Sequence, residues 1–316
     1  MISAGDTSRG RRAPKKNRDA VVVINPNAGR FDSEEAERVV DRLSTRLRTE
    51  VVTTGARDVG ISLAAEAAAA GVPLVVAFGG DGHVNEVANG LAGTGSALGI
   101  IPGGTMNVFA RALDIPLDPL RAADHLIAAL DVPERTVPLG RMDERYFTFS
   151  AGCGFDAEAA ERVERDIPAK RRFGELFFYW SAFRVLASTY RHRNPSMLLE
   201  GPFGTVPVAM AVACNAGPYA YLAGRSIHLA PDVDLEAGLD IFALKRMRLE
   251  AFPLYAWRSI FSGQFIDHPD AFYRHDLTSF EVHAQQPFAR HVDGEPLEPR
   301  TSSRFELVAD ILRVRA

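Results

Sequence analysis

The chain has 316 residues, which is enough for two domains with hydrophobic cores of their own. Its composition, 47% hydrophobic and 24% charged, is typical of a soluble globular protein. A net charge of −4 argues against a general nucleic-acid binder, because contacts to phosphate backbones require basic surface. The two cysteines imply neither a disulfide framework nor a cysteine metal site, and fit a reducing cytosol. No run of about 18 apolar residues occurs, so we expect no transmembrane segment.

Residues 1–18 form a polar, basic stretch without the apolar core of a secretory signal. We predict a disordered basic tail here. The alternative is an electrostatic tether to anionic lipid, to which each basic side chain near the surface contributes about 1 kcal/mol. The basic residues are Arg9, Arg11, Arg12, Lys15, Lys16 and Arg18.

Strands and helices alternate in the first half of the chain, from residue 19 to residue 138. Residues 21–24 form an apolar run typical of a buried strand, and residues 25–29 follow it as a turn. The next expected elements are a helix capped by Ser33, a strand over residues 50–53, a helix over residues 64–70, and, after Pro116 and Pro119 interrupt the chain, a helix over residues 121–130. Such alternation predicts a parallel sheet with helices on both faces.

Within this half, an apolar run at residues 75–78 leads into Gly79-Gly80-Asp81-Gly82 and then into an amphipathic helix. The apolar positions of that helix follow the spacing i, i+3, i+4, i+7 at Val84, Val87, Ala88 and Leu91. Glycines leave backbone N–H groups uncovered, and a helix N-terminus adds partial positive charge, so such a turn suits a bound anion. A tight turn that binds nothing has the same pattern.

The pattern of strand, glycine loop and helix recurs at residues 97–105, which end in Gly103-Gly104-Thr105, and the helix is expected over residues 106–113. Together with the turn at residues 25–29, three loops would lie at the carboxyl ends of parallel strands. Open α/β sheets bind ligands at that edge. The convergence of the three loops predicts a ligand site there.

After residue 138, short strands with alternating patterning predominate. They predict a β-rich antiparallel domain over residues 139–304, with a C-terminal segment, about residues 305–316, returning to the first domain. The expected strands cover residues 145–150, 206–213, 239–244, 279–284 and 289–292.

Residues 174–190 are rich in aromatic and aliphatic side chains and lie between basic residues at 170–172 and 191–193. We interpret this segment as a helix packed on the second sheet. A helix lying in a membrane interface is the alternative, because basic ends around an aromatic helix suit that position.

None of the loops contains the Gly-x-x-x-x-Gly-Lys-[Ser/Thr] sequence of a P-loop, and few lysines lie near them. Backbone N–H groups, helix N-termini, Thr105 and a metal ion held partly by Asp81 would therefore meet the charge of a phosphate. Glu86 lies in the first turn of its helix, where interaction with the helix dipole alone can explain it.

Phosphoryl transfer also requires a group that orients or deprotonates the acceptor hydroxyl. The candidate is the acidic pair in His291-Val292-Asp293-Gly294-Glu295. An Asp-Gly pair between two strands is also a common hairpin turn, and the spacing alone leaves both interpretations open.

Taken together, these motifs resemble the bacterial diacylglycerol-kinase-type lipid kinases, whose fold is related to that of NAD kinases and phosphofructokinases. The resemblance runs from about residue 20 to the C-terminus. The Gly-Gly-Asp-Gly element is shared with the wider superfamily, whereas the late Asp-Gly-Glu indicates the lipid-kinase branch. The matching segments are Asn25-Pro26-x-x-Gly29, Gly79-Gly80-Asp81-Gly82-x-x-x-Glu86, Asn89-Gly90-Leu91, Pro102-Gly103-Gly104-Thr105-x-Asn107-x-Phe109-Ala110-Arg111, Gly152-x-Gly154-Phe155-Asp156, Asn215 and Val292-Asp293-Gly294-Glu295-Pro296.

This resemblance implies an ATP-dependent kinase that uses Mg²⁺ and phosphorylates diacylglycerol or a related lipid alcohol. It places the protein in the cytoplasm as a peripheral protein at the inner membrane surface, and a homodimer is a further expectation. Asp293 is expected to act as general base, with Glu295 supporting it or the metal. The first domain, expected to be NAD kinase/diacylglycerol kinase-like, would bind ATP through Asn25, Pro26, Asn27, Ala28, Gly29, Thr54, Gly79, Gly80, Asp81, Gly82, His83, Glu86, Gly104, Thr105 and Asn107.

Three positions depart from the family's pattern. His83 stands where Thr or Ser is usual, so an imidazole would replace a hydroxyl as donor to phosphate. Pro138 stands where an aspartate is frequent, and residues 236–240 lack the first acid of a segment that can hold a structural metal. These departures leave two alternatives open: a soluble kinase of NAD or a sugar-like metabolite, and a nucleotide-binding regulatory protein with little turnover.

Overall fold

The computed structural model describes residues 19–28, 31–159, 196–222, 225–246 and 264–316. The basic tail at residues 1–18, Gly29 and the aromatic segment at residues 174–190 lie outside the described residues. The chain divides into two compact units. Unit 1 comprises Met1–Val137 and Asp310–Ala316, and unit 2 comprises Pro138–Ala309.

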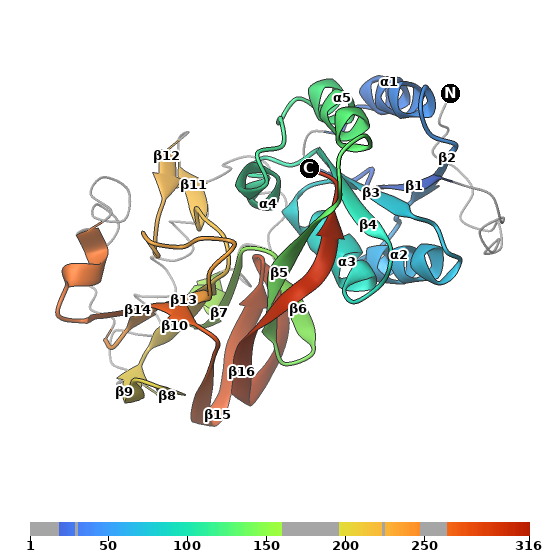
Figure 1. The fold of residues 1–316 in the computed structure, drawn as a ribbon. Helices are drawn as coiled ribbons and strands as arrows, with labels where there is room; N and C mark the ends of the chain where they lie inside the picture. Colours follow the sequence, from blue (N-terminus) through green and yellow to red (C-terminus); the bar gives the residue numbers. More distant parts are fainter. Residues whose placement is uncertain (1–18, 29–30, 160–195, 223–224, 247–263) are drawn as a thin grey trace. The chain divides into compact units, whose positions relative to one another are not determined.

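Unit 1 is an α/β domain built on a parallel sheet with the strand order β4-β3-β1-β2 (Figure 1). Strands β1, β3 and β4 are buried along their whole length, which explains their continuous apolar runs. The last residues of β16 pair in parallel with β4. The elements are β1 (Ala20–Ile24), α1 (Ser33–Ser44), β2 (Thr49–Thr53), α2 (Val59–Ala69), β3 (Leu74–Gly79), α3 (Asp81–Leu91), β4 (Ala97–Pro102), α4 (Val108–Ala112) and α5 (Pro119–Ala129).

Helices cover both faces of this sheet, as the alternation of elements predicts. Helices α1 and α5 pack together on one face, and α2 and α3 pack together on the other (Figure 1). Gly90 permits a close approach of α3 to α2, because a Cβ at this position would lie 2.4 Å from the carbonyl oxygen of Ile61.

Helix starts differ from the predictions for local reasons. Helix α1 is capped by Asp32 rather than Ser33, because the Asp32 carboxylate accepts a backbone N–H of the first turn at 2.8 Å. Pro119, expected to interrupt the chain, is the first residue of α5, where its missing N–H costs nothing. Helix α4 is shorter than the expected helix over residues 106–113, because Asn107 before it adopts a left-handed conformation with φ 48°.

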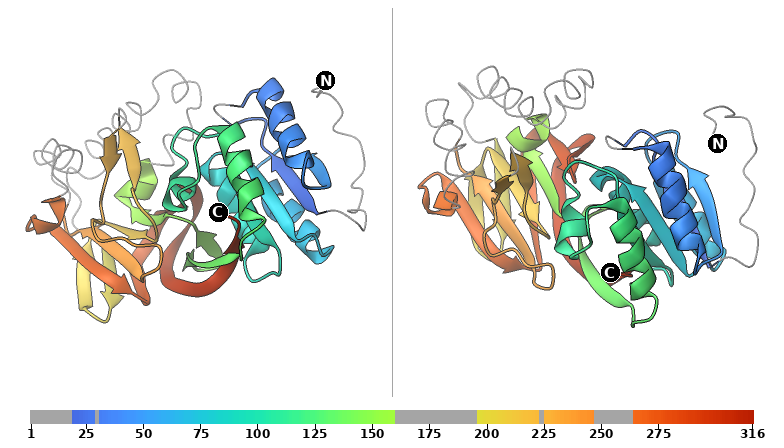
Figure 2. Two further views of the ribbon diagram at one scale, coloured as in Figure 1. Left: turned by 45° about the horizontal axis from the view of Figure 1, so that its top comes forward. Right: turned by 90° about the horizontal axis from the view of Figure 1, so that it is seen from above.

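Unit 2 is a β-rich antiparallel domain, as the sequence predicts. Its sheet runs in the order β14-β13-β10-β7-β15-β16, and β8 pairs with β15 and β9. Figure 2 shows β10, in yellow, beside β13, in orange, and β11 and β12 form a separate two-stranded sheet. The elements are β5 (Arg135–Met142), which starts in unit 1, β6 (Arg145–Phe147), β7 (Ser150–Gly154), β8 (Met197–Gly201), β9 (Gly204–Val208), β10 (Met210–Cys214), β11 (Ala220–Leu222), β12 (Arg225–Ile227), β13 (Leu239–Leu244), η3 (Gln264–Asp267), β14 (Ala271–Leu277), β15 (Ser279–Val292) and β16 (Glu295–Val314), which ends in unit 1.

Strand boundaries in unit 2 differ from the predictions at three places. Residues 279–292 form one strand, because a register shift between His283 and Phe288 accommodates the polar residues that separate its two apolar runs. Residues 206–213 are divided between β9 and β10, and residues 145–150 between β6 and β7. The predicted strand over residues 239–244 coincides with β13.

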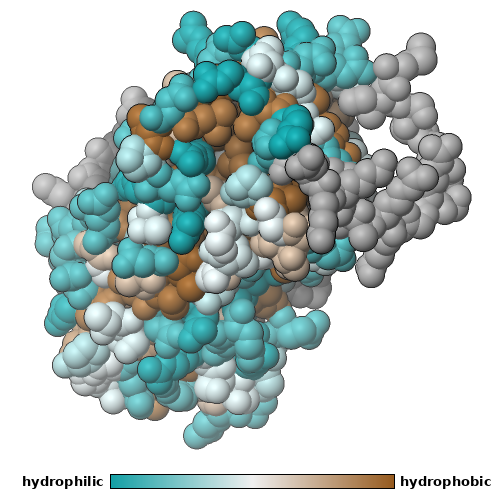
Figure 3. Space-filling model, turned by 45° about the vertical axis from the view of Figure 1, so that its right-hand side comes forward, coloured by the Kyte–Doolittle hydropathy of each residue, from teal (hydrophilic) through white to brown (hydrophobic). Residues whose placement is uncertain are grey.

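The core of unit 2 contains several fully buried aromatic side chains. Phe280 and Phe305 stack with ring centroids 4.9 Å apart within a cluster that also contains Phe147. Hydrophilic and hydrophobic residues are interspersed on the face of the molecule that Figure 3 shows. Among the described residues, the large hydrophobic side chains that are exposed belong to separate segments of the chain: Val51, Val132 and Leu198.

Candidate active site

The loops that follow the strands of the parallel sheet lie at one edge of unit 1. They begin at Asn25 after β1, at Thr54 after β2, at Gly80 after β3 and at Gly103 after β4. The strand order reverses direction between β1 and β3, and open α/β sheets bind ligands at such a switch point. The structure therefore brings the three predicted loops to a common edge, apart from Gly29, which lies outside the described residues.

Two glycine pairs let the loops after β3 and β4 pack backbone against backbone. The N–H of Gly103 donates to the carbonyl oxygen of Gly79 at 2.8 Å. A Cβ on Gly104 would lie 2.7 Å from the Cα of Gly80, and a Cβ on Gly103 would lie 3.2 Å from the Cα of Gly79. Both loops therefore carry Gly-Gly because a side chain would force them apart.

Asn107 and Asp81 hold this double loop in shape. Asn107 accepts the N–H of Gly104 with Oδ1 at 2.9 Å and donates from Nδ2 to the carbonyl oxygen of the same residue at 2.8 Å. Asp81, the first residue of α3, accepts the N–H of Val108 with Oδ1 at 2.6 Å and thereby caps α4. Thr105 is exposed on the turn between them. Asp81 therefore has a structural contact besides its predicted approach to a nucleotide-bound metal ion.

Helix α3 begins directly at the double loop. Gly80 precedes the helix and has no side chain that can cap it. The first N–H groups of a helix lack partners within the helix and carry partial positive charge. Gly82 in the first turn adds no side chain that could cover them. Phosphate groups fit this arrangement, because backbone donors and the helix dipole act on the same point.

The loop after β1 is shaped by its own first side chain. Asn25 accepts the N–H of Asn27 with Oδ1 at 2.9 Å, and its carbonyl oxygen accepts the N–H of Ala28 at 3.1 Å. Pro26 and Asn27 are exposed on this turn. Thr54 is buried at the end of β2, and its N–H donates to the last carbonyl of β1 at 2.9 Å. The structure thus fixes the backbone of the first loop, whereas Thr54 joins β2 to β1.

His83 is directed toward β1. Its Nε2 lies 2.8 Å from the carbonyl oxygen of Val23, so this nitrogen carries the proton and donates. The side chain is 4% exposed, and burial lowers the pKa of the imidazole. In this tautomer Nδ1 is an acceptor, and it has no hydrogen-bond partner among the described residues. These contacts argue against the expected role of His83 as a donor to phosphate.

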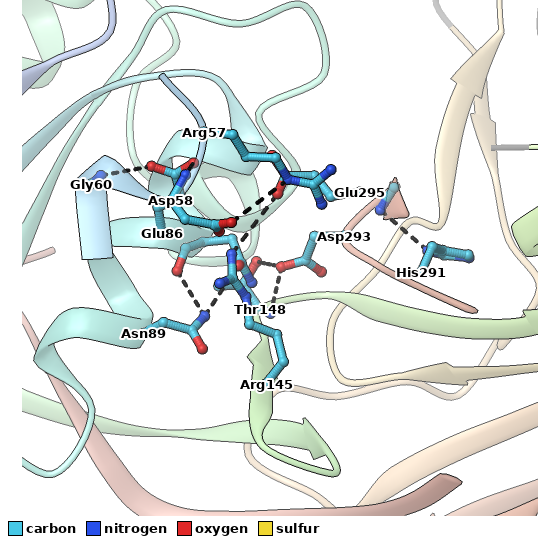
Figure 4. Close-up of polar contacts among 12 residues, drawn as sticks. Arg57, Asp58, Gly60, Glu86, Asn89, Arg145, Thr148, His291, Asp293 and Glu295 are labelled. Carbon is cyan, nitrogen blue, oxygen red and sulfur yellow. Dashed lines mark hydrogen bonds and ion pairs between the residues drawn. The ribbon is translucent and has the colours of Figure 1, made fainter. Parts of the chain in front are cut away.

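Glu86 caps a neighbouring helix. Its Oε1 accepts the N–H of Asp58 at 2.8 Å, and its Oε2 accepts the N–H of Gly60 at 2.9 Å (Figure 4). Asp58 precedes α2 in a left-handed conformation and makes no side-chain cap of its own. The carboxylate on α3 therefore takes the place of the missing cap on α2, a role distinct from the expected interaction with its own helix dipole. A contact of Glu86 with nucleotide stays a prediction.

In unit 2, Asp293 and Gly294 form the two-residue turn between β15 and β16. Both have positive φ, 48° and 80°, as a type I′ hairpin turn requires. The Asp293 carboxylate accepts four hydrogen bonds: Oδ2 from the N–H and hydroxyl of Thr148 at 2.8 and 2.7 Å, and Oδ1 from the N–H groups of Phe149 and Ser150 at 3.0 and 2.9 Å (Figure 4). The hairpin interpretation is therefore right for the backbone, and the side chain ties the turn to the start of β7.

Burial decides the direction of the Asp293 pKa. The residue is 6% exposed, and desolvation raises the pKa of its carboxyl above the usual value, against the opposing effect of the hydrogen bonds from Ser150, Thr148 and Phe149. A higher pKa makes a carboxylate a stronger base. Sequence reasoning missed Thr148, because a threonine between two phenylalanines reads as an ordinary strand residue.

Glu295 is the first residue of β16 and is partly exposed. Its carboxylate lies 3.9 Å from the guanidinium of Arg145. Asn215, one of the matching positions of the resemblance, donates from Nδ2 to the carbonyl oxygens of Thr148 at 3.0 Å and of Pro138 at 3.5 Å. Asn215 thus supports the segment that donates to Asp293, and Pro138 takes part through its backbone.

The segment that can hold a structural metal in the resembled family contains Asp240, which is fully buried here. One of its carboxylate oxygens accepts the hydroxyl of Tyr273. The other lies 2.7 Å from Nδ1 of His275 and accepts the N–H of Asp276 at 3.2 Å. Within the described ranges, no group of three or more His, Cys, Asp or Glu side chains is arranged to hold a metal ion. Three protein donors therefore surround Asp240.

In the part of the chain that the structure describes, no helix has both the length and the apolar character needed to cross a bilayer.

Comparison with known proteins covers both units. Residues 19–141 match the diacylglycerol kinase catalytic domain, and residues 150–316 match the YegS C-terminal NAD kinase beta sandwich-like domain. The chain is 30% identical over 286 residues to a diacylglycerol kinase from Bacillus subtilis, which covers 87% of this chain and 89% of that protein. It is 32% identical over 239 residues to a YegS-like lipid kinase from Pseudomonas putida, with 75% of each chain covered.

Two solved structures show the same fold. A diacylglycerol kinase from Bacillus anthracis superposes with a TM-score of 0.71 at 23% identity and covers 95% of this chain and 98% of its own. An NAD kinase from Archaeoglobus fulgidus in complex with ATP gives a TM-score of 0.53 at 11% identity and covers 94% of this chain and 93% of its own. The predicted combination of a parallel α/β domain with an antiparallel β-rich domain is confirmed.

Proposed function

Because the chain belongs to the diacylglycerol kinase family and is a kinase, we propose that it transfers the γ-phosphate of ATP to the hydroxyl of diacylglycerol or of a closely related lipid alcohol. The observation that supports nucleotide binding best is the backbone contact between the two glycine loops at the start of α3. There a Cβ on Gly104 would lie 2.7 Å from the Cα of Gly80.

In this proposal, unit 1 binds ATP through backbone N–H groups rather than through lysine. The predicted loops at residues 25–29, 79–82 and 103–105 would contact the nucleotide and its phosphates, with Thr54 and Asn107 shaping their surroundings. Mg²⁺ would enter with ATP, because the described residues offer no cluster of carboxylates that could bind it alone. Its chemistry would be to neutralise charge on the phosphate oxygens, and Asp81 is the carboxylate placed at these loops.

Unit 2 would supply the base. In the reaction, the acceptor hydroxyl oxygen bonds to the γ-phosphorus, the bond to the β-phosphate oxygen breaks, and the hydroxyl proton passes to a carboxylate. Asp293 suits this role because burial raises its pKa and because one of its four donors, the hydroxyl of Thr148, can rotate away and leave a lone pair for the incoming proton. Glu295, two residues further along the chain, would support it.

A lipid acceptor would place the reaction at a membrane. Diacylglycerol is confined to lipid bilayers and ATP to the aqueous phase of the cytoplasm, so the enzyme would act as a peripheral protein at the inner membrane surface.

The test is transfer of labelled phosphate from γ-labelled Mg-ATP to dioleoylglycerol in mixed vesicles, followed by extraction into organic solvent. Vesicles with trioleoylglycerol, which has no free hydroxyl, are the matched control. We expect labelled phosphatidic acid with the first lipid and no labelled lipid with the second. If no lipid is labelled, but labelled phosphate is transferred to added NAD or to an added sugar alcohol, the lipid assignment is contradicted. If the protein binds ATP and transfers phosphate to no acceptor, turnover is contradicted.

A further inference from the structure

Residues 152–156 match the family pattern, yet they belong neither to the nucleotide loops nor to the proposed base. Gly152 lies on β7, and Asp156 lies in the helical residues that follow this strand. His291 lies on β15 directly opposite Gly152 in the antiparallel pairing. Residues 152–156 therefore lie next to the end of β15, where His291 precedes Asp293 by two residues.

A chain of hydrogen bonds runs from this segment to the hairpin turn. Asp156 is bonded to the hydroxyl of Tyr219 through Oδ1 and to Nε2 of His291 through Oδ2. The other ring nitrogen of His291, Nδ1, accepts the N–H of Gly294 at 3.3 Å (Figure 4). A backbone N–H can only donate, so Nδ1 is the acceptor, and the imidazole proton is on Nε2 and is donated to Asp156.

Gly152 provides the space for this pair. A Cβ at position 152 would lie 2.3 Å from Oδ2 of Asp156 and 2.4 Å from Nε2 of His291. Both side chains are almost completely buried, with 5% and 2% exposed. The hydrogen-bonded pair thus occupies the place that a side chain of β7 would fill, which explains the glycine.

We propose that Asp156 and His291 are positioning residues for the turn that carries the catalytic carboxylate, an inference that rests on the proposed function. Asp156 fixes the tautomer and the orientation of the imidazole, and Nδ1 then holds the Gly294 N–H. The donors from residues 148–150 fix the Asp293 side of the turn, and His291 fixes the Gly294 side. With both sides held, the Asp293 carboxylate has a defined position relative to an acceptor hydroxyl.

The consequence for the rate is large because displacement of a catalytic group by about 1 Å can cost on the order of 10²-fold. Loss of the hydrogen-bond partner that orients a metal-ligating side chain lowers activity by roughly 10–100-fold, and we expect an effect of the same order here. In the proposed function the loops of unit 1 bind the nucleotide, so we expect substitutions at Asp156 or His291 to leave the affinity for ATP unchanged. The expected signature is a lower kcat at an unchanged KM for ATP.

Two amide substitutions separate the two bonds of His291. His291→Gln retains an N–H donor at the position of Nε2, toward Asp156, and loses the acceptor for Gly294. His291→Asn retains an acceptor at the position of Nδ1 and loses the reach to Asp156. The matched control is His275→Gln in the same unit, because His275 also pairs with a buried aspartate, Asp240, but has no bond to the turn.

We expect kcat to fall by roughly 10–100-fold in His291→Gln and less in His291→Asn, with KM for ATP unchanged in both and with near-normal kcat in His275→Gln. Hydrogen exchange measured on the peptide that contains residues 292–296 should become faster in His291→Gln and not in His275→Gln. Equal exchange and equal kcat in folded wild type and His291→Gln would overturn the inference.

The exchange measurement also separates this inference from the proposed function. If the wild type transfers no phosphate to lipid, the proposed function fails, while faster exchange in His291→Gln still supports the positioning of the turn. If His291→Gln does not fold, as judged by circular dichroism, the same two readouts on His291→Asn decide: wild-type exchange together with wild-type kcat would then overturn the role of Asp156.

Discussion

Asp293 accepts hydrogen bonds on both carboxylate oxygens, and one of the donors, the hydroxyl of Thr148, can rotate. The three backbone N–H groups belong to residues 148–150 at the start of β7, whereas the hydroxyl of Thr148 turns about its own bond. Substituting Asp293 by Asn would turn an amide NH₂ toward backbone N–H donors, so that variant would disturb the turn as well as the base. Thr148 therefore offers a cleaner test of the base than Asp293 itself.

We expect Thr148→Val to move the acidic limb of the pH–rate profile to higher pH. A base acts in its ionised form, so activity rises as pH passes through the pKa of Asp293. Burial holds that pKa above the usual value, and the Thr148 hydroxyl lowers it, so removal of the hydroxyl raises it further. The measurement is kcat/KM against pH, with Thr205→Val, an exposed strand position in the same unit, as control. An unmoved limb in Thr148→Val would remove Asp293 from the role of base.

Glu86 shows a second long-range contact made by a single carboxylate. Its two oxygens accept the N–H groups of Asp58, the residue that precedes α2, and of Gly60 in the first turn of that helix. In Glu86→Gln one oxygen becomes an NH₂ group that faces an N–H donor, so we expect the free energy of unfolding to fall by about 1–3 kcal/mol. Urea unfolding measures this change. Glu66→Gln, an exposed position of α2, is the control and should stay within about 0.5 kcal/mol of the wild type. Equal midpoints for the two variants would rule out the capping role.

The loops after β3 and β4 form one packed unit, because their glycines are in backbone contact. We expect Gly104→Ala to lower the free energy of unfolding by about 1–3 kcal/mol, since its Cβ would lie 2.7 Å from the Cα of Gly80. The same displacement should weaken ATP binding by roughly tenfold, which corresponds to about 1.4 kcal/mol. Calorimetric titration with ATP checks the second expectation.

The control for this pair of measurements is Gly95→Ala in the same unit, because a Cβ on Gly95 would have no heavy atom within 4 Å. ATP affinity of Gly95→Ala should equal that of the wild type. If Gly104→Ala also bound ATP as tightly as the wild type, the double loop would not be the phosphate site.

The strands β13 and β14 are joined by side chains around the buried carboxylate of Asp240. Tyr273 and His275 on β14 both contact it. Because these protein donors already surround the carboxylate, we expect removal of divalent metal to leave the stability of the apo-protein unchanged. The melting temperature, measured without nucleotide, should be the same in EDTA and in Mg²⁺. A clear decrease in EDTA would show that a metal stabilises the fold.

For the whole molecule, the sequence is sufficient to predict the class of each half, because apolar runs of strand length and helical spacing are local properties. It predicts β13 to the residue and the loops after β1, β3 and β4. It misses β14 because polar residues in that strand, Arg274, His275 and Asp276, interrupt the alternation. The sequence also predicts two strands in place of β15, because the polar residues around Gln285 resemble a turn. In the sheet, these residues form an irregular part of one strand.

The residues of the candidate site follow the same rule. The glycine loops are visible in the sequence because their chemistry is contained in neighbouring residues. Helix α2 starts at Val59, five residues before the expected start. This start depends on the carboxylate of Glu86, 27 positions further along the chain, and no local sequence pattern reveals that contact. Likewise, the direction of the His83 ring depends on the carbonyl oxygen of Val23 on another strand. Contacts between distant segments decide what these side chains bind.

Phosphorus NMR of the wild-type reaction follows the proposed transfer of the γ-phosphate from ATP to a lipid hydroxyl without any label. Purified protein is incubated with Mg-ATP and with dioleoylglycerol in mixed micelles of a detergent without phosphorus, and all phosphorus signals are followed together. We expect one lipid phosphomonoester for each ADP formed, with no free phosphate. ADP that appears with inorganic phosphate, or with a phosphomonoester that stays in the aqueous phase after extraction, would contradict it.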